Sequence, residues 1–415
     1  MSIHVTAQNV GHAGLASSRP SPLLPDVGVI GFVPEEWGGL WMPRHQVLIR
    51  LSKYFHVVWA EPPRGWRDLW FGGSPCQDTM PPDPVFHKGF VRFQSGRWHP
   101  QIYRPAILAS WVANRRVHHI ADTLRRRGCK SIVCYLWRPE FSYALDADVC
   151  DMSCYHIDDE YSFSSSEQPL DDHEVQLIRR VDQVFIHSPA LLERKGYLNS
   201  HTLFVPNGVD YRSFADSHEE PADMREIPRP RLGYVGNLKT QLNFGLLLDL
   251  AGRHPEWSFV LVGPRGYLGD DAAILDQLSA LPNVYWLGNK SVEAVGAYPQ
   301  HMDVCLLPYV CNDYTKYIYP LKLHEYLASG CPVVGAPIQS LLSFQHVIKL
   351  ASDVNGWESA IADALSPDAV SPDAIETRRR IAQGFDWNVL VHRIAKTMCD
   401  RLSSEQARRF ASMVD

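Results

Sequence analysis

The sequence lacks the cysteine and histidine spacings that structural and hydrolytic zinc sites use. No C-x-x-C and no H-E-x-x-H occurs among the 415 residues, and the nine cysteines are an odd number scattered along the chain. These absences argue against a structural zinc site and against a disulfide scaffold. We therefore expect reduced cysteines and a cytoplasmic chain.

Long apolar runs and an excess of positive charge are missing as well. No run approaches the roughly 18–20 residues that span a bilayer, so no transmembrane helix is expected. Residues 1–26 contain no apolar core of a signal peptide, and we interpret them as a disordered leader. The formal net charge of −6 gives no reason to expect a nucleic-acid partner.

Two series of apolar strands and amphipathic helices make up the rest of the chain. Runs such as 27–33 and 131–137 are typical of parallel strands covered on both faces, whereas 63–105 is expected to be irregular. A charged stretch with three prolines separates the two series. This alternation predicts an α/β protein with two doubly wound parallel sheets. The predicted parts are an N-terminal domain at 27–212, a linker at 213–230, a C-terminal domain at 231–384 and a terminal helix and tail at 385–415.

The segment YIYPLKLHEYLASGCPVVG (317–335) combines helix signals with paired charges. Pro320 suits the first turn of a helix, and Gly330 suits the left-handed position that ends one. Lys322 and Glu325 are three residues apart and therefore share one face near the helix N-terminus. There Lys322 and the free N–H groups could hold a diphosphate, while Glu325 could accept both hydroxyls of a ribose. The alternative interpretation is an ordinary ion pair on a solvated helix.

This segment resembles the donor-binding signature of GT-B glycosyltransferases, in which a P-x-K-x-x-E-Y-L-A-x-G-x-P-V-V pattern recurs. VPNGVD (205–210), GYVGN (233–237) and FDWNVLVHRIAKTM (385–398) resemble further pieces of that family in its own order. The resemblance implies a GT-B fold, with two Rossmann-like domains that face a cleft and a C-terminal helix that crosses back to the N-terminal domain. It also implies that the N-terminal domain binds the acceptor and the C-terminal domain binds a nucleotide-sugar.

The resemblance implies donor-binding residues at strand ends and on the helix after Pro320. They are Gly236, Asn237, Gly263, Arg265, Tyr319, Lys322 and Glu325. On the first domain, Gly38 and Gly39 could bring the backbone close to the donor diphosphate, and His45 is a candidate acceptor-side residue. Plainer alternatives are a tight turn for the glycines, a loop-stabilising asparagine, a surface arginine and a structural histidine.

One departure from the family bears on the stereochemistry. Retaining members of glycosyltransferase family 4 carry two glutamates separated by seven residues; Glu325 matches the second, and Tyr317 stands where the first would be. The missing carboxylate favours an inverting mechanism, which needs a general base on the acceptor side. The apolar run at 152–157 ends directly before two acids, in a Y-x-x-x-D pattern that resembles inverting xanthan-pathway glucuronosyltransferases and teichuronic-acid-type transferases. We predict Asp159 as the base and Asp158 as the second candidate; a solvated turn or an Asx cap is the alternative.

These features predict a glycosyltransferase of polysaccharide biosynthesis. It would move a sugar from a nucleotide-sugar to a hydroxyl of a glycan, lipid-linked or small-molecule acceptor. The family resemblance implies that the donor is a UDP-sugar. The nucleotide-sugar is a substrate, and we expect no cofactor and no metal, because Lys322 and helix N-termini would neutralise the leaving diphosphate. The alternatives are a retaining transferase whose first glutamate is replaced, a non-hydrolysing sugar-nucleotide epimerase, and a catalytically inactive GT-B partner protein.

Residues 88–130 form a basic and aromatic stretch. They hold ten Lys or Arg residues and one acid, Asp122, with Trp98, Tyr103 and Trp111 interleaved. Such a surface suits an anionic bilayer or a polyprenyl-diphosphate acceptor. We therefore expect peripheral association with the inner face of the membrane; an ordinary solvated helix face is the alternative.

Overall fold

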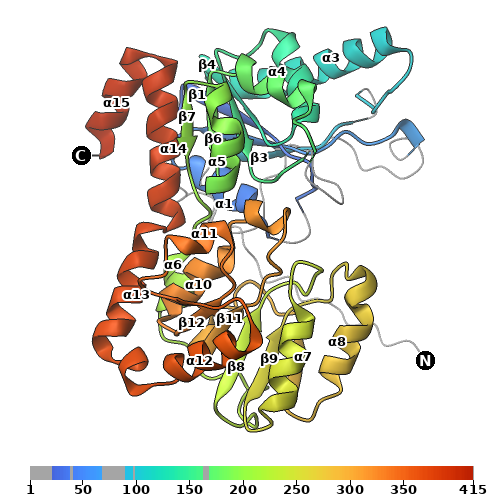
Figure 1. Cartoon of the computed structure of the whole chain (residues 1–415). Helices are drawn as coiled ribbons and strands as arrows, with labels where there is room; N and C mark the ends of the chain where they lie inside the picture. Colours follow the sequence, from blue (N-terminus) through green and yellow to red (C-terminus); the bar gives the residue numbers. More distant parts are fainter. Residues whose placement is uncertain (1–20, 38–40, 68–88, 97–98, 162–167, 415) are drawn as a thin grey trace, which may run out of the picture. The chain divides into compact units, whose positions relative to one another are not determined.

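The computed structural model describes residues 21–37, 41–67, 89–96, 99–161 and 168–414 (Figure 1). The internal contacts of the chain divide it into two compact units. Unit 1 comprises the residues up to Tyr155 together with Ala395–Asp415, and unit 2 comprises His156–Ile394. The domain boundaries that the sequence suggests stay predictions, and residues 1–20 of the expected leader lie outside the described residues.

Strands β1 to β7 form one sheet in the order β3-β2-β1-β4-β5-β6-β7. Their bounds are β1 Val27–Phe32, β2 His56–Ala60, β3 Phe90–Phe93, β4 Ser131–Leu136, β5 Met152–Ile157, β6 Gln183–Ile186 and β7 Thr202–Phe204. The pairs β3–β2, β2–β1, β1–β4, β4–β5 and β6–β7 are parallel. Strands β1, β5 and β6 are buried at every residue, as expected for parallel strands covered on both faces. The expectation of an irregular stretch at 63–105 is wrong at β3, whose four residues are too few to show a period of their own.

Helices and 3-10 turns connect these strands: α1 Pro43–Leu51, α3 Ala106–Arg125, η1 Pro139–Ala147, α4 Asp172–Arg180, α5 Pro189–Lys195 and η2 Gly196–Leu198. On α3, Val117, Ile120 and Leu124 form the buried stripe that the sequence suggests. Gly128 follows this helix with a φ of 91°, the left-handed conformation expected after a helix end. Among the described residues, no helix is both long enough and apolar enough to cross a bilayer.

Strands β8 to β13 form a second sheet in the order β10-β9-β8-β11-β12-β13, and all neighbouring pairs are parallel. Their bounds are β8 Arg231–Val235, β9 Ser258–Val262, β10 Val284–Gly288, β11 Val304–Leu307, β12 Val333–Gly335 and β13 Lys349–Leu350. The chain moves outward from β8 to β10 and then returns to the other side of β8 to form β11. In a doubly wound sheet, ligands bind beyond the carboxyl ends of the two strands at such a reversal.

Helices pack around this second sheet. Their bounds are α6 Tyr211–Ala215, α7 Phe244–Arg253, α8 Ala272–Ser279, α9 Ala297–Gln300, α10 Leu321–Ser329, α11 Gln339–Leu342, α12 Val354–Ala364 and α13 Pro372–Gly384, with 3-10 turns η3 Gly269–Asp271, η4 Thr315–Tyr317 and η5 Pro367–Val370. Helix α10 packs against α13, α6 and α9, while α7 packs against α8 and α12 (Figure 1). The Val235 amide donates to the Tyr326 hydroxyl at 2.8 Å, and this bond ties α10 to β8.

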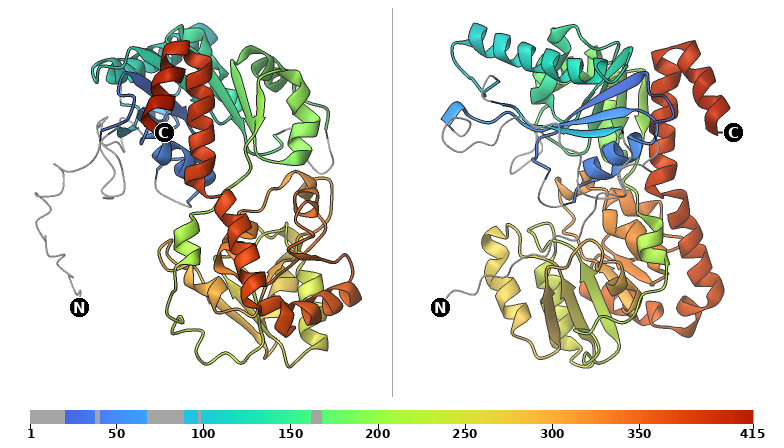
Figure 2. Two further views of the ribbon diagram at one scale, coloured as in Figure 1. Left: turned by 90° about the vertical axis from the view of Figure 1, so that its left-hand side faces the viewer. Right: turned by 180° about the vertical axis from the view of Figure 1, so that it is seen from behind.

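The last two helices return the chain to unit 1. They are α14 Trp387–Leu402 and α15 Ser404–Val414, and Figure 2 shows α15 beside the last turns of α14. Asp26 accepts hydrogen bonds from Gln406 at 3.1 Å and from Arg409 at 2.6 Å. The ring centroids of Phe410 and Tyr54 are 5.4 Å apart. The return of the C-terminal helix to the part of the chain with the N-terminal strands is thus confirmed.

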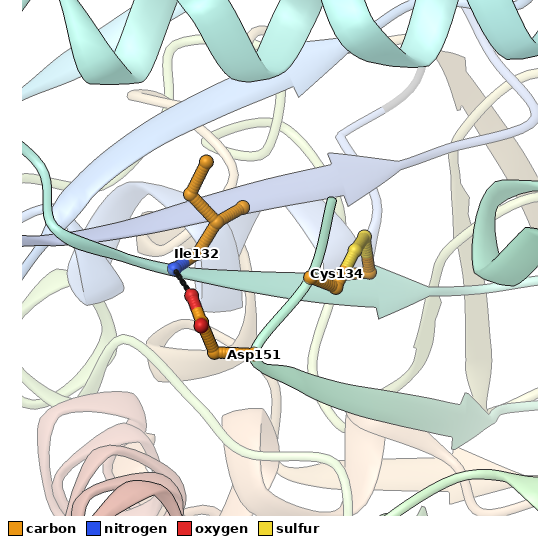
Figure 3. The surroundings of a disulfide bond; sticks show 4 residues. Ile132, Cys134 and Asp151 are labelled. Carbon is orange, nitrogen blue, oxygen red and sulfur yellow. Dashed lines mark hydrogen bonds between the residues drawn. A yellow bond between two sulfur atoms is a disulfide. The ribbon is translucent and has the colours of Figure 1, made fainter. Parts of the chain in front are cut away.

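A disulfide joins Cys134 on β4 to Cys150, which precedes β5 (Figure 3). The two Cα atoms lie 5.8 Å apart, within the range that a disulfide bridges. Beside it, the Ile132 amide donates to the Asp151 carboxylate at 2.7 Å and holds the start of β5 against β4 (Figure 3). The expectation that all cysteines are reduced is wrong for this pair, because parallel neighbouring strands bring together residues that are 16 positions apart in sequence.

Candidate functional site

Helix α10 carries the charged pair that the sequence singles out. It begins after Pro320 and ends at Gly330, whose φ of 85° is the left-handed conformation predicted for it. Lys322 Nζ lies 3.4 Å from Glu325 Oε2, and the two side chains are 22% and 18% exposed. The ion pair that we considered as the alternative is therefore present. Both side chains also remain accessible to a ligand.

Two glycines bring the backbone of neighbouring strand ends close to this helix. Gly236 follows β8 and Gly263 follows β9. A Cβ on Gly263, whose φ is 138°, would collide with the carbonyl oxygen of Gly236. A Cβ on Gly236 would lie 2.6 Å from Cε of Lys322. Three of the predicted donor-binding residues therefore meet at the carboxyl end of β8.

The loops after β8 and β11 are tied to each other at the same end of the sheet. The Asn243 amide donates to the Pro308 carbonyl at 2.7 Å, and the Val310 amide donates to the Gln241 carbonyl at 2.9 Å. β8 and β11 are the strands between which the chain reverses its direction of growth. The cluster of Gly236, Gly263 and Lys322 thus lies where doubly wound sheets bind their ligands.

Asn237 and Arg265, also predicted as donor-binding residues, differ in their surroundings. Asn237 Oδ1 is buried and has no hydrogen-bond partner in the part of the chain that the structure describes. A buried amide oxygen in that state is available to a ligand donor. Arg265 instead donates to Asp276 at 2.8 Å, and its side chain is 37% exposed. This arrangement is the surface ion pair of the plainer interpretation.

Tyr319 is buried and faces the protein interior. Its hydroxyl lies 2.9 Å from Nε2 of His324, and Asn207 donates to its carbonyl at 2.8 Å. Burial raises the pKa of Tyr319 and lowers the pKa of His324 to about 3, so the imidazole is neutral. His324 also stacks on Phe385 with ring centroids 4.0 Å apart. These contacts position the start of α10, and the sequence analysis missed His324 although it lies between the two charged residues.

Two tyrosines near Glu325 were also missed. Tyr234 on β8 and Tyr309 after β11 are buried, and the Tyr234 hydroxyl donates to the Asn237 carbonyl at 3.4 Å. Burial raises the pKa of both hydroxyls, and the neighbouring Glu325 charge raises it further. Both hydroxyls are therefore neutral groups beside Glu325. Both tyrosines lie near the carboxyl ends of strands of the second sheet, which is the signal that could have identified them.

The acidic segment after β5 places its three carboxylates in different surroundings. Asp158 accepts a hydrogen bond from the Tyr161 hydroxyl, and Asp159 Oδ1 accepts the Glu160 amide at 2.8 Å. Both aspartates are half-buried. Glu160 is buried and lies 3.1 Å from Lys195 Nζ. The Asp159 bond is to the next residue along the chain and is not an Asx cap, and partial exposure leaves both aspartates within reach of solvent.

A network of buried charges supports this segment. Lys195 is fully buried and lies 2.9 Å from both carboxylate oxygens of Glu174. Arg194 Nε lies 3.0 Å from Glu160 Oε2, and its guanidinium lies 5.8 Å from the ring centroid of Tyr317. The network therefore connects the acidic segment with the position at which a retaining family member would carry its first glutamate. Sequence reasoning missed it, because the four charged residues come from three separate stretches of chain.

His45 lies within an aromatic cluster of unit 1. Its Nδ1 accepts the Met42 amide at 3.1 Å, so the ring carries its proton on Nε2, which donates to the Trp37 carbonyl at 3.4 Å. Burial lowers the pKa of His45 to about 4. The Trp59 ring centroid lies 4.4 Å away. Both ring nitrogens are occupied, as in the structural interpretation; Gly38 and Gly39 lie outside the described residues.

Comparisons with known proteins match this architecture. Residues 229–366 match the family model described as Glycosyl transferases group 1. TuaH of Bacillus subtilis (strain 168), named as a teichuronic acid biosynthesis glycosyltransferase, is 32% identical over 236 residues, which are 54% of this chain and 58% of TuaH. The match thus spans less than two thirds of that relative.

Solved structures resemble nearly the whole chain. HepE of Anabaena, in complex with UDP and glucose, has a TM-score of 0.63 at 14% identity and covers 90% of this chain and 99% of HepE. A UDP-forming α,α-trehalose-phosphate synthase from Burkholderia xenovorans has a TM-score of 0.62 at 13% identity and covers 92% of this chain and 100% of its own. The resemblance predicted from the sequence is confirmed: residues 229–366 match the group 1 glycosyltransferase family model, and the chain shares the GT-B fold of these solved structures.

Proposed function

We propose that this protein is a glycosyltransferase that moves a sugar from a UDP-sugar to a hydroxyl group of an acceptor. The observation that carries the proposal is the cluster of Lys322, Glu325 and the backbone of Gly236 and Gly263 at the switch point of the second sheet. HepE binds UDP and glucose on the same fold, which supports UDP as the nucleotide. TuaH is named for teichuronic acid biosynthesis, which supports a glycan or lipid-linked acceptor.

The donor is held by charge and by backbone. Lys322 leaves Glu325 and pairs with the diphosphate, whose charge also favours the N-terminus of α10. Glu325 then accepts hydrogen bonds from the ribose hydroxyls. Asn237 Oδ1 accepts a hydrogen bond from a donor group of the nucleotide. Gly236 and Gly263 allow the diphosphate to approach the backbone of their loops, because neither residue has a side chain that would lie between the two. We expect no metal requirement, since Lys322 and the helix N-terminus neutralise the leaving group.

The chemical step is an inverting displacement. Asp159 takes the proton of the acceptor hydroxyl, whose oxygen attacks the anomeric carbon while the bond from that carbon to the diphosphate oxygen breaks. UDP leaves with the electron pair, and the product has the opposite anomeric configuration. Glu160 is held by Lys195 and Arg194, which keeps the neighbouring Asp159 in place. Tyr317, at the position of the missing acid, supports inversion over retention.

Calorimetry with UDP tests the donor site. Lys322→Ala should weaken UDP binding by about 1.5–3 kcal/mol, the strength of a hydrogen bond to a charged group. Glu325→Ala should weaken it through loss of the ribose contact. Lys349→Ala is the matched control, since Lys349 is exposed and pairs with Asp363. Unchanged affinity in the first two variants would refute this donor site.

Turnover tests the reaction itself. Purified protein, UDP-sugar and a panel of acceptors should yield UDP and a glycoside, and NMR of the anomeric proton reports its configuration. Retention of configuration would exclude the Asp159 mechanism. Release of an epimerised sugar-nucleotide would indicate an epimerase. Neither transfer nor donor hydrolysis would indicate an inactive partner protein.

A further inference from the structure

The start of α3 presents large apolar side chains to solvent. Ile107 is 86% exposed, Trp111 55% and Leu108 43%. Tyr103, four residues before Ile107, is 80% exposed. Single exposed apolar residues are ordinary on proteins, whereas a contiguous group marks an interaction surface.

Trp66 joins this group from a different part of unit 1. A parallel bridge pairs Gly65 with Gln101, and the Gln101 amide donates to the Arg64 carbonyl at 2.7 Å. This bridge holds Trp66 beside the residues that lead into α3. The Trp66 side chain is 52% exposed. We call Trp66, Tyr103, Ile107, Leu108 and Trp111 the apolar patch.

Basic side chains continue the same face of α3 beyond the apolar patch. Ile107, Trp111 and Arg115 are spaced four residues apart and therefore lie in one row along the helix. The Arg115 guanidinium lies 5.4 Å from the Trp111 ring centroid. Further along, Arg125 and Arg126 are exposed, and the helix's one acid, Asp122, pairs with Arg125 at 3.3 Å.

The opposite face of α3 is occupied by the protein core. Val112, Val117, Ile120 and Leu124 are buried there. The helix is thus fixed to unit 1 by one face and presents to solvent a second face that is apolar at its start and charged further along, where Arg115, Arg125 and Arg126 outnumber Asp122. A bilayer interface has the same sequence of properties, with acyl chains, then headgroup carbonyls, then phosphates.

We propose that the exposed face of α3, together with Trp66, docks this protein onto an anionic lipid bilayer. Ile107, Leu108 and Trp111 enter the boundary between headgroups and acyl chains, where tryptophan is favoured. Arg115 and Arg126 pair with lipid phosphates, so charge complementarity selects anionic headgroups. A nucleic acid would meet the same charge, but the aliphatic side chains offer it no contact. The proposal goes beyond the proposed reaction and does not depend on it.

Flotation of the full chain with vesicles tests the proposal. The protein should float with phosphatidylcholine mixed with phosphatidylglycerol, remain behind with phosphatidylcholine alone, and be released as salt rises. The double variant Ile107→Ser with Trp111→Ser should lower the partition coefficient about tenfold or more, because two large apolar side chains no longer insert. Arg115→Glu should lower it about fivefold or more.

Matched variants of unit 2 are the controls. Leu342→Ser with Val370→Ser replaces two apolar residues that are 45% and 49% exposed, and Arg380→Glu reverses an exposed charge. These should float like the wild type. Equal loss in the controls, equal binding to phosphatidylcholine alone, or no binding to anionic vesicles at low salt would overturn the proposal. Calorimetry with UDP separates the two ideas: wild type that floats without binding UDP refutes the proposed reaction and leaves the docking surface standing.

Discussion

Asp159 is the residue on which the proposed chemistry depends most directly. Asp159→Asn keeps the side-chain size and an oxygen that can accept the Glu160 amide, but it cannot take a proton from the acceptor. We predict a fall in kcat of about 10²–10⁴-fold. Affinity for UDP should stay unchanged, because the donor contacts come from other residues. Initial rates and calorimetry on the same preparation measure both quantities.

Two neighbouring substitutions sharpen this comparison. Asp158→Asn should reduce kcat less, since Asp158 would act only through the charge that it places beside the proposed base. Asp172→Asn, at an exposed position in the first turn of α4, is the matched control and should leave kcat unchanged. Wild-type turnover by Asp159→Asn would mean that another group is the base.

Gly263 offers a second test at a single residue. Alanine there would push the carbonyl of Gly236 away, so we predict a loss of about 1–3 kcal/mol in the free energy of unfolding and weaker UDP binding. Gly252→Ala in α7 is the control, because its Cβ would meet no atom within 4 Å. Alanine also favours a helix interior over glycine by about 1 kcal/mol. If urea unfolding finds the two variants equally stable, the close approach of the two loops is not a constraint.

Among the elements, the end of β5 is held to α4 and α5 by the buried charge network. Lys195→Met would leave Glu160 without its lysine and Glu174 without its bidentate partner. We predict a loss of about 3–5 kcal/mol in the free energy of unfolding, the cost of an uncompensated buried charge. Chemical denaturation measures it.

The control for Lys195→Met is an exposed pair. Lys396→Met removes a lysine that pairs with Asp400 one turn away on the surface and should cost less than about 1 kcal/mol. Adding Glu174→Gln to Lys195→Met should recover part of the loss, because one buried charge disappears. A Lys195→Met protein as stable as the wild type would show that water reaches the network.

At the same scale, sequence patterns predict elements well and contacts between elements poorly. The apolar runs at β1, β4 and β8 and the glycine that ends α10 are local signals, because burial on both faces and a left-handed φ depend on few neighbours. The pairing of Cys134 with Cys150 and the approach of Arg194 to Tyr317 depend on which elements become neighbours. No period or motif in one stretch of sequence contains that information.

Across the whole molecule, buried histidines, His45, His99 and His324 among them, make stability sensitive to acid. Burial lowers the pKa of His45 to about 4 and of His324 to about 3, from 6.5 in an exposed state. The unfolded chain therefore binds protons first, so this stability is present above about pH 6.5 and is lost as the pH falls toward the folded values. We predict a decrease in the free energy of unfolding of about 1.4 kcal/mol per pH unit for each histidine across that window.

Urea unfolding between pH 7 and 4 measures this slope. His45→Gln should flatten it, and the exposed His118→Gln should leave it unchanged. Asp26 contributes in a lower window, because its hydrogen bond with Arg409 lowers its pKa below 3.8 and its stabilisation is lost only as the pH falls through that lowered value. A free energy of unfolding that stays constant between pH 6.5 and 4 would contradict the prediction.

The return of α15 to unit 1 sets an order of events during synthesis. A ribosome releases the residues up to Tyr155 long before Ala395–Asp415, which belong to the same unit. The contacts of Asp26 with Arg409 and of Tyr54 with Phe410 therefore form only after every residue of unit 2 has emerged. Nascent unit 1 spends most of translation with an uncovered apolar surface, which is the kind of surface that chaperones bind. A chain that stops at Ile394 would hold the protein in that state.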